Sequence, residues 1–170
     1  MDSKVRELFA KISKENETDA GNAGERFAEE WFKKQSFRYL KIPQSKSTKP
    51  KELIERNAKR PDFELLTDNE EQVMFMADAK YHQTENCSSF TLSIDEINQY
   101  KAFKRWVLDE CPDGSICEIC FILFPKELNG ERLVVIGLDE FESGVETVIG
   151  NEKKPALKIQ LNDNNLWFDN

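Results

Sequence analysis

The run VMFMADAKY at positions 73–81 places one acid and one base inside an otherwise apolar segment. Its length and composition are typical of a buried strand, in which residues two positions apart lie on the same face. Asp78 and Lys80 would therefore share a face, with Ala79 turned away between them. Burying a carboxylate is costly unless it is paired or holds a cation, so the fold of this segment has to bring a partner to Asp78.

A second apolar run, PDFELL at 61–66, precedes this segment, and TDNEE at 67–71 is typical of the turn between them. The two runs predict an antiparallel hairpin in which residues near positions 62 and 78 lie opposite each other. Two facing carboxylates repel unless a proton or a cation lies between them. Mg²⁺ is held by a few carboxylate oxygens, with waters and a substrate phosphate completing its shell.

Lys80 beside such a cation would orient or deprotonate an attacking water and stabilise the charge that builds on phosphorus. These groups together favour metal-assisted hydrolysis of a phosphodiester. Each residue also has a simpler interpretation. Asp62 would cap a turn after Pro61. Asp78 would form a structural ion pair with Lys80 or Arg60.

The remaining pattern predicts one domain in which helices and strands alternate. A capping box, Ser93 and Glu96, opens a helix over 94–110 whose core positions include Tyr100. The order of elements favours an α/β sandwich with a mixed central sheet. Helices are also predicted over 1–16 and 25–35 with one helical turn near 52–56; strands over 37–42, 116–124, 131–138, 145–150 and 156–161; and a loop over 86–93.

Four segments together resemble the PD-(D/E)XK nuclease superfamily. The motif halves are RPD at 60–62 and DAK at 78–80, each joined to an apolar strand. Upstream, GNAGERFAEEWFKKQSFRYLKI at 21–42 is similar to the first helix and strand of that superfamily, and downstream SIDEINQYKAF at 93–103 is similar to its next helix. The resemblance covers residues 20–125, with a helical extension before it over 1–18 and C-terminal strands after it over 126–170.

The resemblance implies a restriction-endonuclease-like fold, a three-layer sandwich with a mixed β-sheet flanked by helices. It implies a Mg²⁺-dependent nuclease, with Mn²⁺ able to substitute, as in Holliday junction resolvases and related endonucleases. Lys80 would position the attacking water. Glu25 follows the glycine pattern of the family and would complete the metal site, and Glu29, one turn on, is the alternative. The implied metal ligands are Glu25, Asp62, Asp78 and the carbonyl of Ala79.

Three further residues are candidates for contact with the substrate. Gln99 matches a glutamine that lies near the substrate in several branches of the superfamily, and otherwise it is a surface residue of the helix. Arg60 would contact phosphate or only neutralise its neighbours. His82, the single histidine, would share the face of Lys80 if the strand continues, and a lone histidine is more often packed or solvent-facing than a catalytic base.

The charge of the chain is unevenly distributed. The net charge is −8, which argues against coating of nucleic acid through bulk charge. Residues 33–60 nevertheless carry ten Lys and Arg against two Glu. This basic segment would contact the phosphate backbone, or form a solvated lysine-rich loop. DNA is favoured as the partner, and RNA stays an alternative because a metal and a lysine act on the phosphate of both.

No segment predicts a separate module that reads sequence. Specificity would come from loops, DNA shape, a partner or homodimerisation, which resolvase-like members commonly use. The rival hypothesis is a catalytically inactive nuclease-fold protein that binds a partner. In that case Asp62, Asp78 and Lys80 would form a structural ion network.

The cysteines and the N-terminal segment indicate a compartment. Cys117 and Cys120 lie three apart in ICEICFILF, a predicted strand, so their side chains would point to opposite faces and not converge on one zinc. We expect reduced, buried cysteines. No apolar run approaches the length of a membrane span, and the first residues lack the pattern of a signal peptide. The expectation is a cytoplasmic protein without membrane contact.

Overall fold

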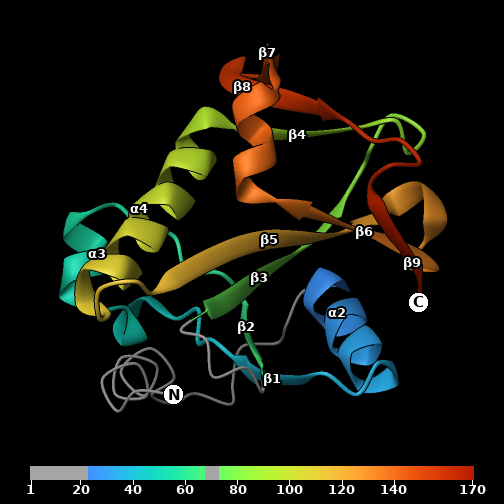
Figure 1. Cartoon of the computed structure of the whole chain (residues 1–170). Helices are drawn as coiled ribbons and strands as arrows, with labels where there is room; N and C mark the ends of the chain where they lie inside the picture. Colours follow the sequence, from blue (N-terminus) through green and yellow to red (C-terminus); the bar gives the residue numbers. More distant parts are fainter. Residues whose placement is uncertain (1–22, 68–72) are drawn as a thin grey trace.

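Two long strands, β3 (Val73–His82) and β5 (Ile116–Pro125), lie side by side and parallel at the centre of the molecule (Figure 1). They belong to a computed structural model that describes residues 23–67 and 73–170. The helix predicted over 1–16 and most of the turn predicted over 67–71 lie outside the described residues. The described residues form a mixed α/β fold.

The central sheet has six strands in the order β1-β2-β3-β5-β6-β9. Only the β3–β5 pair is parallel, and the other neighbours pair antiparallel. The prediction of a mixed central sheet is therefore confirmed. One edge of this sheet is β9 (Leu166–Asp169). The other edge is β1 (Arg38–Lys41). The strands β2 (Phe63–Leu66) and β6 (Arg132–Gly137) lie between the edge strands and the central pair.

A second, three-stranded antiparallel sheet has the order β4-β8-β7. Its strands are β4 (Ser89–Ser93), β7 (Val145–Ile149) and β8 (Lys154–Gln160). The loop predicted over 86–93 is wrong in its second half. Phe90 and Leu92 alternate with small polar residues and are both buried, which is a strand pattern that the surrounding serines conceal.

Two longer helices cover opposite faces of the central sheet, as the positions of α2 (Ala23–Lys34) and α4 (Ile94–Glu110) in Figure 1 show. Period-two alternation along β3 and β5 divides their side chains between these faces. Ala77 and Ala79 pack with Phe32 of α2, whereas Met74 and Met76 pack in the cluster that contains the apolar side of α4. The same division separates Cys117 from Cys120, as predicted.

The remaining helical segments are short. They are α3 (Lys51–Glu55) and the 3₁₀ turns η1 (Lys46–Thr48), η2 (Lys126–Leu128) and η3 (Leu138–Ser143). All four cysteines are free thiols; Cys117 is buried and the other three are half-buried. Among residues 23–67 and 73–170, no helix is long and apolar enough to cross a membrane.

Packing on the α2 face depends on Phe32, which is fully buried and lies within 5.3 Å, centroid to centroid, of the Phe63 ring. Replacing Phe32 with alanine removes this contact and leaves a cavity. We expect a loss of about 3–5 kcal/mol in the free energy of unfolding, measured by urea denaturation. Phe37 is the matched control because its ring contacts the same cluster but is 49% exposed. A loss in Phe37→Ala as large as that in Phe32→Ala would contradict this account.

Candidate active site

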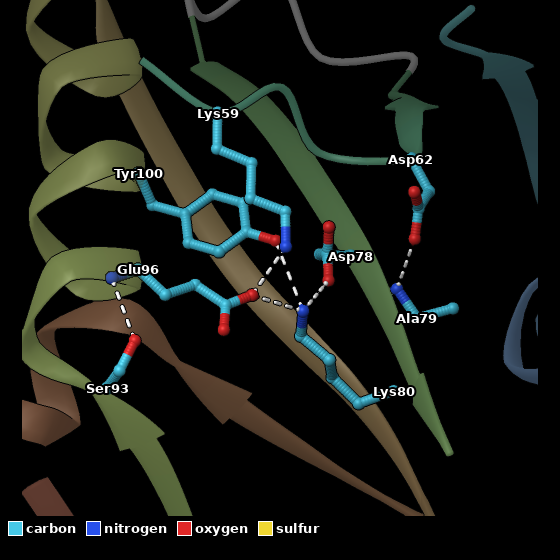
Figure 2. Close-up of polar contacts among 8 residues, drawn as sticks. All are labelled: Lys59, Asp62, Asp78, Ala79, Lys80, Ser93, Glu96 and Tyr100. Atoms are coloured by element: carbon cyan, nitrogen blue, oxygen red, sulfur yellow. Dashed lines mark hydrogen bonds and ion pairs between the residues drawn. The ribbon is translucent and has the colours of Figure 1, made fainter. Parts of the chain in front are cut away.

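Asp62 and Asp78 face each other across two adjacent strands. In the β2–β3 hairpin Phe63 pairs with Ala77, and one further step of this antiparallel register brings position 62 opposite position 78. Asp62 is 8% and Asp78 2% exposed. One carboxylate oxygen of Asp62, Oδ2, accepts a hydrogen bond from the backbone N–H of Ala79 at 2.8 Å (Figure 2). The predicted antiparallel pairing of the two strands is confirmed, and Asp62 lies close enough to Asp78 to feel its charge.

The pKa of Asp62 reflects this crowding. Burial and the charge of Asp78 raise it to about 8, although the amide of Ala79 and the charge of Lys80 act in the opposite direction. Glu25 contributes a smaller increase. Asp62 therefore holds a proton at neutral pH unless another cation takes the place of that proton.

Lys80 lies at the centre of a polar network on the α4 face of the sheet (Figure 2). Its Nζ is 2.7 Å from Asp78 Oδ2 and 2.7 Å from Glu96 Oε1, and it donates to the hydroxyl of Tyr100 at 3.3 Å. Burial opposes the charge of Lys80, but the two carboxylates outweigh it and raise the pKa of the amine. Lys80 is thus an ammonium group, suited to orienting a water or an oxyanion and not to removing a proton.

Glu96 is a member of this network that sequence reasoning assigned to a helix cap. The backbone N–H of Glu96 does donate to Ser93 Oγ at 3.1 Å, but the carboxylate binds Lys80 and Lys59 instead of turning back to the cap. Burial opposes ionisation of Glu96, yet the two lysines lower its pKa to about 2. The only sequence signal was the four-residue spacing of Glu96 and Tyr100, which places both on one face of a helix.

Glu64 is a second acid that sequence reasoning did not single out. It follows Asp62 by two positions in the hairpin and is 2% exposed. Burial raises its pKa to about 7. The side chain occupies the same face as Asp62 because strand residues alternate, but it lies next to Met76 in the register and so farther from Lys80.

The two glutamates proposed for the metal site lie one turn apart on α2. Lys41 Nζ lies between them, 3.0 Å from Glu25 Oε2 and 2.8 Å from Glu29 Oε1. Glu25 is buried and close enough to Asp62 to affect its pKa. Glu29 accepts a hydrogen bond from Tyr39 at 3.5 Å. Of the two, Glu25 is the carboxylate with an electrostatic connection to the aspartate pair.

The three candidate substrate residues lie at two different places. Arg60 is buried, and its guanidinium donates to backbone carbonyls of Ser45 at 2.9 Å and Thr48 at 3.0 Å. Gln99 lines the same pocket as Arg60. His82 is exposed at the end of β3, which does continue to this residue.

A cleft of about 340 Å³ lies beside His82. It runs between the start of α2 and the end of β3, so it separates the two elements that carry Glu25 and Lys80. Gly24, Ala79, Lys80 and Lys126 contribute to its lining together with His82. The cleft is adjacent to the end of β3 that carries Lys80.

The donor set fits a hard divalent cation in part. Asp62 and Asp78 are two neighbouring carboxylates. A strand residue directs its N–H and C=O to the same side, so the carbonyl of Ala79 faces the end of β2 where Asp62 lies. Two carboxylates and a carbonyl suffice for Mg²⁺, which keeps several waters. In the described part of the chain, however, no three His, Cys, Asp or Glu side chains are grouped closely enough to hold a metal ion as they stand.

Comparison with known proteins adds no assignment for this site: no protein-family model matches the chain, and no curated protein matches its sequence.

The raised pKa of Asp62 predicts how stability depends on pH in metal-free buffer. Between about pH 4 and pH 8 the unfolded state releases the Asp62 proton while the folded state keeps it, so the free energy of unfolding falls as pH rises through this window. Asp62→Asn cannot ionise and removes this contribution. We expect the variant to lose less stability than wild type between pH 5 and pH 8, by on the order of a few kcal/mol.

Urea denaturation at both pH values measures the effect, with Asp139→Asn as a control for loss of an exposed carboxylate. Asp139 forms an ion pair with Lys104 at the surface, and its variant should keep the wild-type pH dependence. Identical pH dependence in wild type and Asp62→Asn would show that Asp62 titrates normally.

Proposed function

We propose that this chain is a metal-dependent phosphodiester hydrolase, with DNA as its favoured substrate. The observation that carries the proposal is the juxtaposition of Asp62 and Asp78 with Lys80 two positions further along the same strand face. This is the arrangement that the resemblance to the PD-(D/E)XK superfamily implies. The helix–sheet–helix layering supports a restriction-endonuclease-like fold, which forms part of the proposal.

Each residue has a role that its environment supports. Asp62, Asp78 and the carbonyl of Ala79 would hold Mg²⁺ or Mn²⁺, with Glu25 completing the set from α2. The bound cation would supply Lewis-acid stabilisation of the charge that builds on the phosphoryl oxygens. Lys80, kept as an ammonium group by its two carboxylate partners, would orient the attacking water and stabilise the same charge.

Glu96 and Tyr100 fix the position of the Lys80 ammonium group. Both residues come from α4. Glu96 Oε1 lies 2.7 Å from Lys80 Nζ, and the Tyr100 hydroxyl accepts a hydrogen bond from Lys80 Nζ at 3.3 Å. Both partners come from a helix and not from a loop, which favours a well-defined lysine position. They would act as positioning residues because neither side chain is proposed to touch the reacting phosphate.

A second candidate function, a partner-binding module without catalysis, is favoured by two observations. Lys80 is already neutralised by Asp78 and Glu96, and no group of three potential metal ligands is formed among the described residues. An ion network of this kind would stabilise the fold without a bound metal ion. Metal binding separates the two functions, because only the hydrolase needs Asp78 to exchange its lysine partner for a cation.

A cleavage assay tests the proposal directly. The substrates are plasmid, linear, single-stranded and four-way-junction DNA and an RNA, each with Mg²⁺ or Mn²⁺. We expect metal-dependent cleavage by wild type and a decrease of about 10²–10³-fold in Lys80→Gln, because one electrostatic group that stabilises the transition state is lost. Asp78→Asn should show a decrease at least as large.

Lys104→Gln is the matched control, since Lys104 also pairs with two carboxylates, Glu118 at 3.4 Å and Asp139 at 3.1 Å. It loses an equivalent ion network on the surface and should cleave as wild type does. Absence of cleavage of every substrate by wild type, or equal activity of Lys80→Gln and wild type, would refute the hydrolase.

Metal binding is measured separately through the melting temperature in increasing Mg²⁺ or Mn²⁺. A ligand at 100 times its Kd stabilises the folded state by about 2.7 kcal/mol, so wild type should melt at a higher temperature with metal. Asp78→Asn should not respond. Asp139→Asn should respond as wild type does, and a wild type indifferent to both metals would favour the partner-binding module.

A further inference from the structure

A pocket of about 210 Å³ lies beside the candidate active site, between the segments that contain η1 and the approach to β2, and against α4. Four cationic side chains contribute to its lining: Lys46, Lys49, Lys59 and Arg60. Gln99 of α4 is a further lining residue. No carboxylate belongs to this lining.

Arg60 is the most buried of these cations, at 3% exposed. Its guanidinium donates only to neutral oxygens, the carbonyls of Ser45 and Thr48 and the hydroxyl of Thr48. Across residues 23–67 and 73–170, no carboxylate forms an ion pair with it. Buried charges are normally paired, whereas residues 23–67 and 73–170 hold this guanidinium in place without neutralising it.

Two lysines add to the unbalanced charge. Lys49 is half-buried, and burial together with the charge of Arg60 lowers its pKa. Lys46 is exposed at the opening. Neither lysine has an ion-pair partner in the described part of the chain, whereas Lys59 is paired with Glu96. The pocket therefore gathers three cations for which the described residues supply no counter-charge.

We propose that this pocket binds a phosphate group. A tetrahedral oxyanion matches the charge-assisted hydrogen bonds that a guanidinium and neighbouring ammonium groups donate. Arg60 is already oriented by Thr48 and Ser45, so little side-chain freedom is lost on binding. An anion carrying two negative charges would offset most of the positive charge that Arg60, Lys46 and Lys49 bring together.

The position of the pocket links it to the proposed chemistry. Lys59 lines the pocket and also binds Glu96, which holds Lys80. Assignment of the phosphate to a nucleic acid rests on the proposed function, whereas phosphate binding itself does not.

Inorganic phosphate is the first probe. The melting temperature of the full chain is measured in increasing phosphate against sodium chloride at equal ionic strength, without divalent metal. We expect phosphate to raise it in a concentration-dependent way, and Lys49→Gln to lose at least half of this rise. Lys51→Gln is the control, because Lys51 is a neighbouring exposed lysine, paired with Glu55, that does not line the pocket.

Lys49 is chosen over Arg60 because Arg60 also holds the η1 segment, so its variants would confuse folding with binding. The phosphate pocket would be overturned if the melting temperature rises no more in phosphate than in chloride. It would also be overturned if phosphate raises the melting temperature equally in wild type and Lys49→Gln. If Lys51→Gln loses as much of the phosphate-induced rise as Lys49→Gln does, the phosphate pocket would also be overturned, since the rise would then depend on the overall positive charge of the surface.

Short oligonucleotides with either a 5′-phosphate or a 5′-hydroxyl then identify the source, with affinity measured in the presence of a chelator. A terminal phosphate monoester is indicated if the 5′-phosphate raises affinity about tenfold in wild type but not in Lys49→Gln. An internal phosphodiester is indicated if Lys49→Gln weakens both ligands equally. Phosphate binding with no effect of Lys49→Gln on either oligonucleotide would overturn the assignment to nucleic acid. None of these measurements requires cleavage, so failure of the hydrolase proposal can be distinguished from failure of the phosphate pocket.

Discussion

The Lys80 ammonium group, held between Asp78 of its own strand and Glu96 of α4, is the interaction on which the arrangement of the site depends. β3 is covered by helices on both faces, and Asp78 and Lys80 are buried between them. Its counter-charges have to come from neighbouring elements. The ion pair to Glu96 therefore ties α4 to the sheet at a defined position, and the position of α4 in turn defines where Lys80 points.

Charge balance explains why Asp62 differs from the other acids. Asp78 and Glu96 carry two negative charges, and Lys80 and Lys59 carry two positive ones. Asp62 is the additional acid, and it is buried next to Asp78. Burial and the charge of Asp78 raise its pKa, and the four other charges balance when Asp62 keeps its proton. A divalent cation would offset the charge of an ionised Asp62, which is the physical basis for the metal chemistry proposed at this point.

The parts of the site that depend on strand geometry could be predicted from the sequence. Period-two alternation put Asp78 and Lys80 on one face, and the antiparallel pairing of β2 with β3 was predicted, with Phe63 opposite Ala77 one step from the two acids. The helix over 94–110 was predicted with its observed bounds. Alternation and capping are local, so short stretches of sequence contain enough information to specify them.

What could not be predicted depends on contacts between distant segments. Glu96 satisfied a local capping pattern, and nothing within its own helix indicated that its carboxylate would turn to Lys80, sixteen residues earlier. β4 was missed because its partner, β8, lies more than sixty residues away in sequence. Arg60 was weighed as a contact to phosphate or a neutraliser of neighbours, but its neutral carbonyl partners come from a turn twelve or more residues upstream.

Lys59 connects the two charged regions of the molecule. Its ammonium group is paired with Glu96 on one side, and its side chain lines the basic pocket on the other. An anion in that pocket would attract Lys59 and weaken its hold on Glu96, and Glu96 would then interact more strongly with Lys80. Stronger pairing of Lys80 with Glu96 would loosen its contact with Asp78, the carboxylate that a metal requires. Occupation of the basic pocket would in this way favour cation binding at the aspartate pair through a short chain of ion pairs.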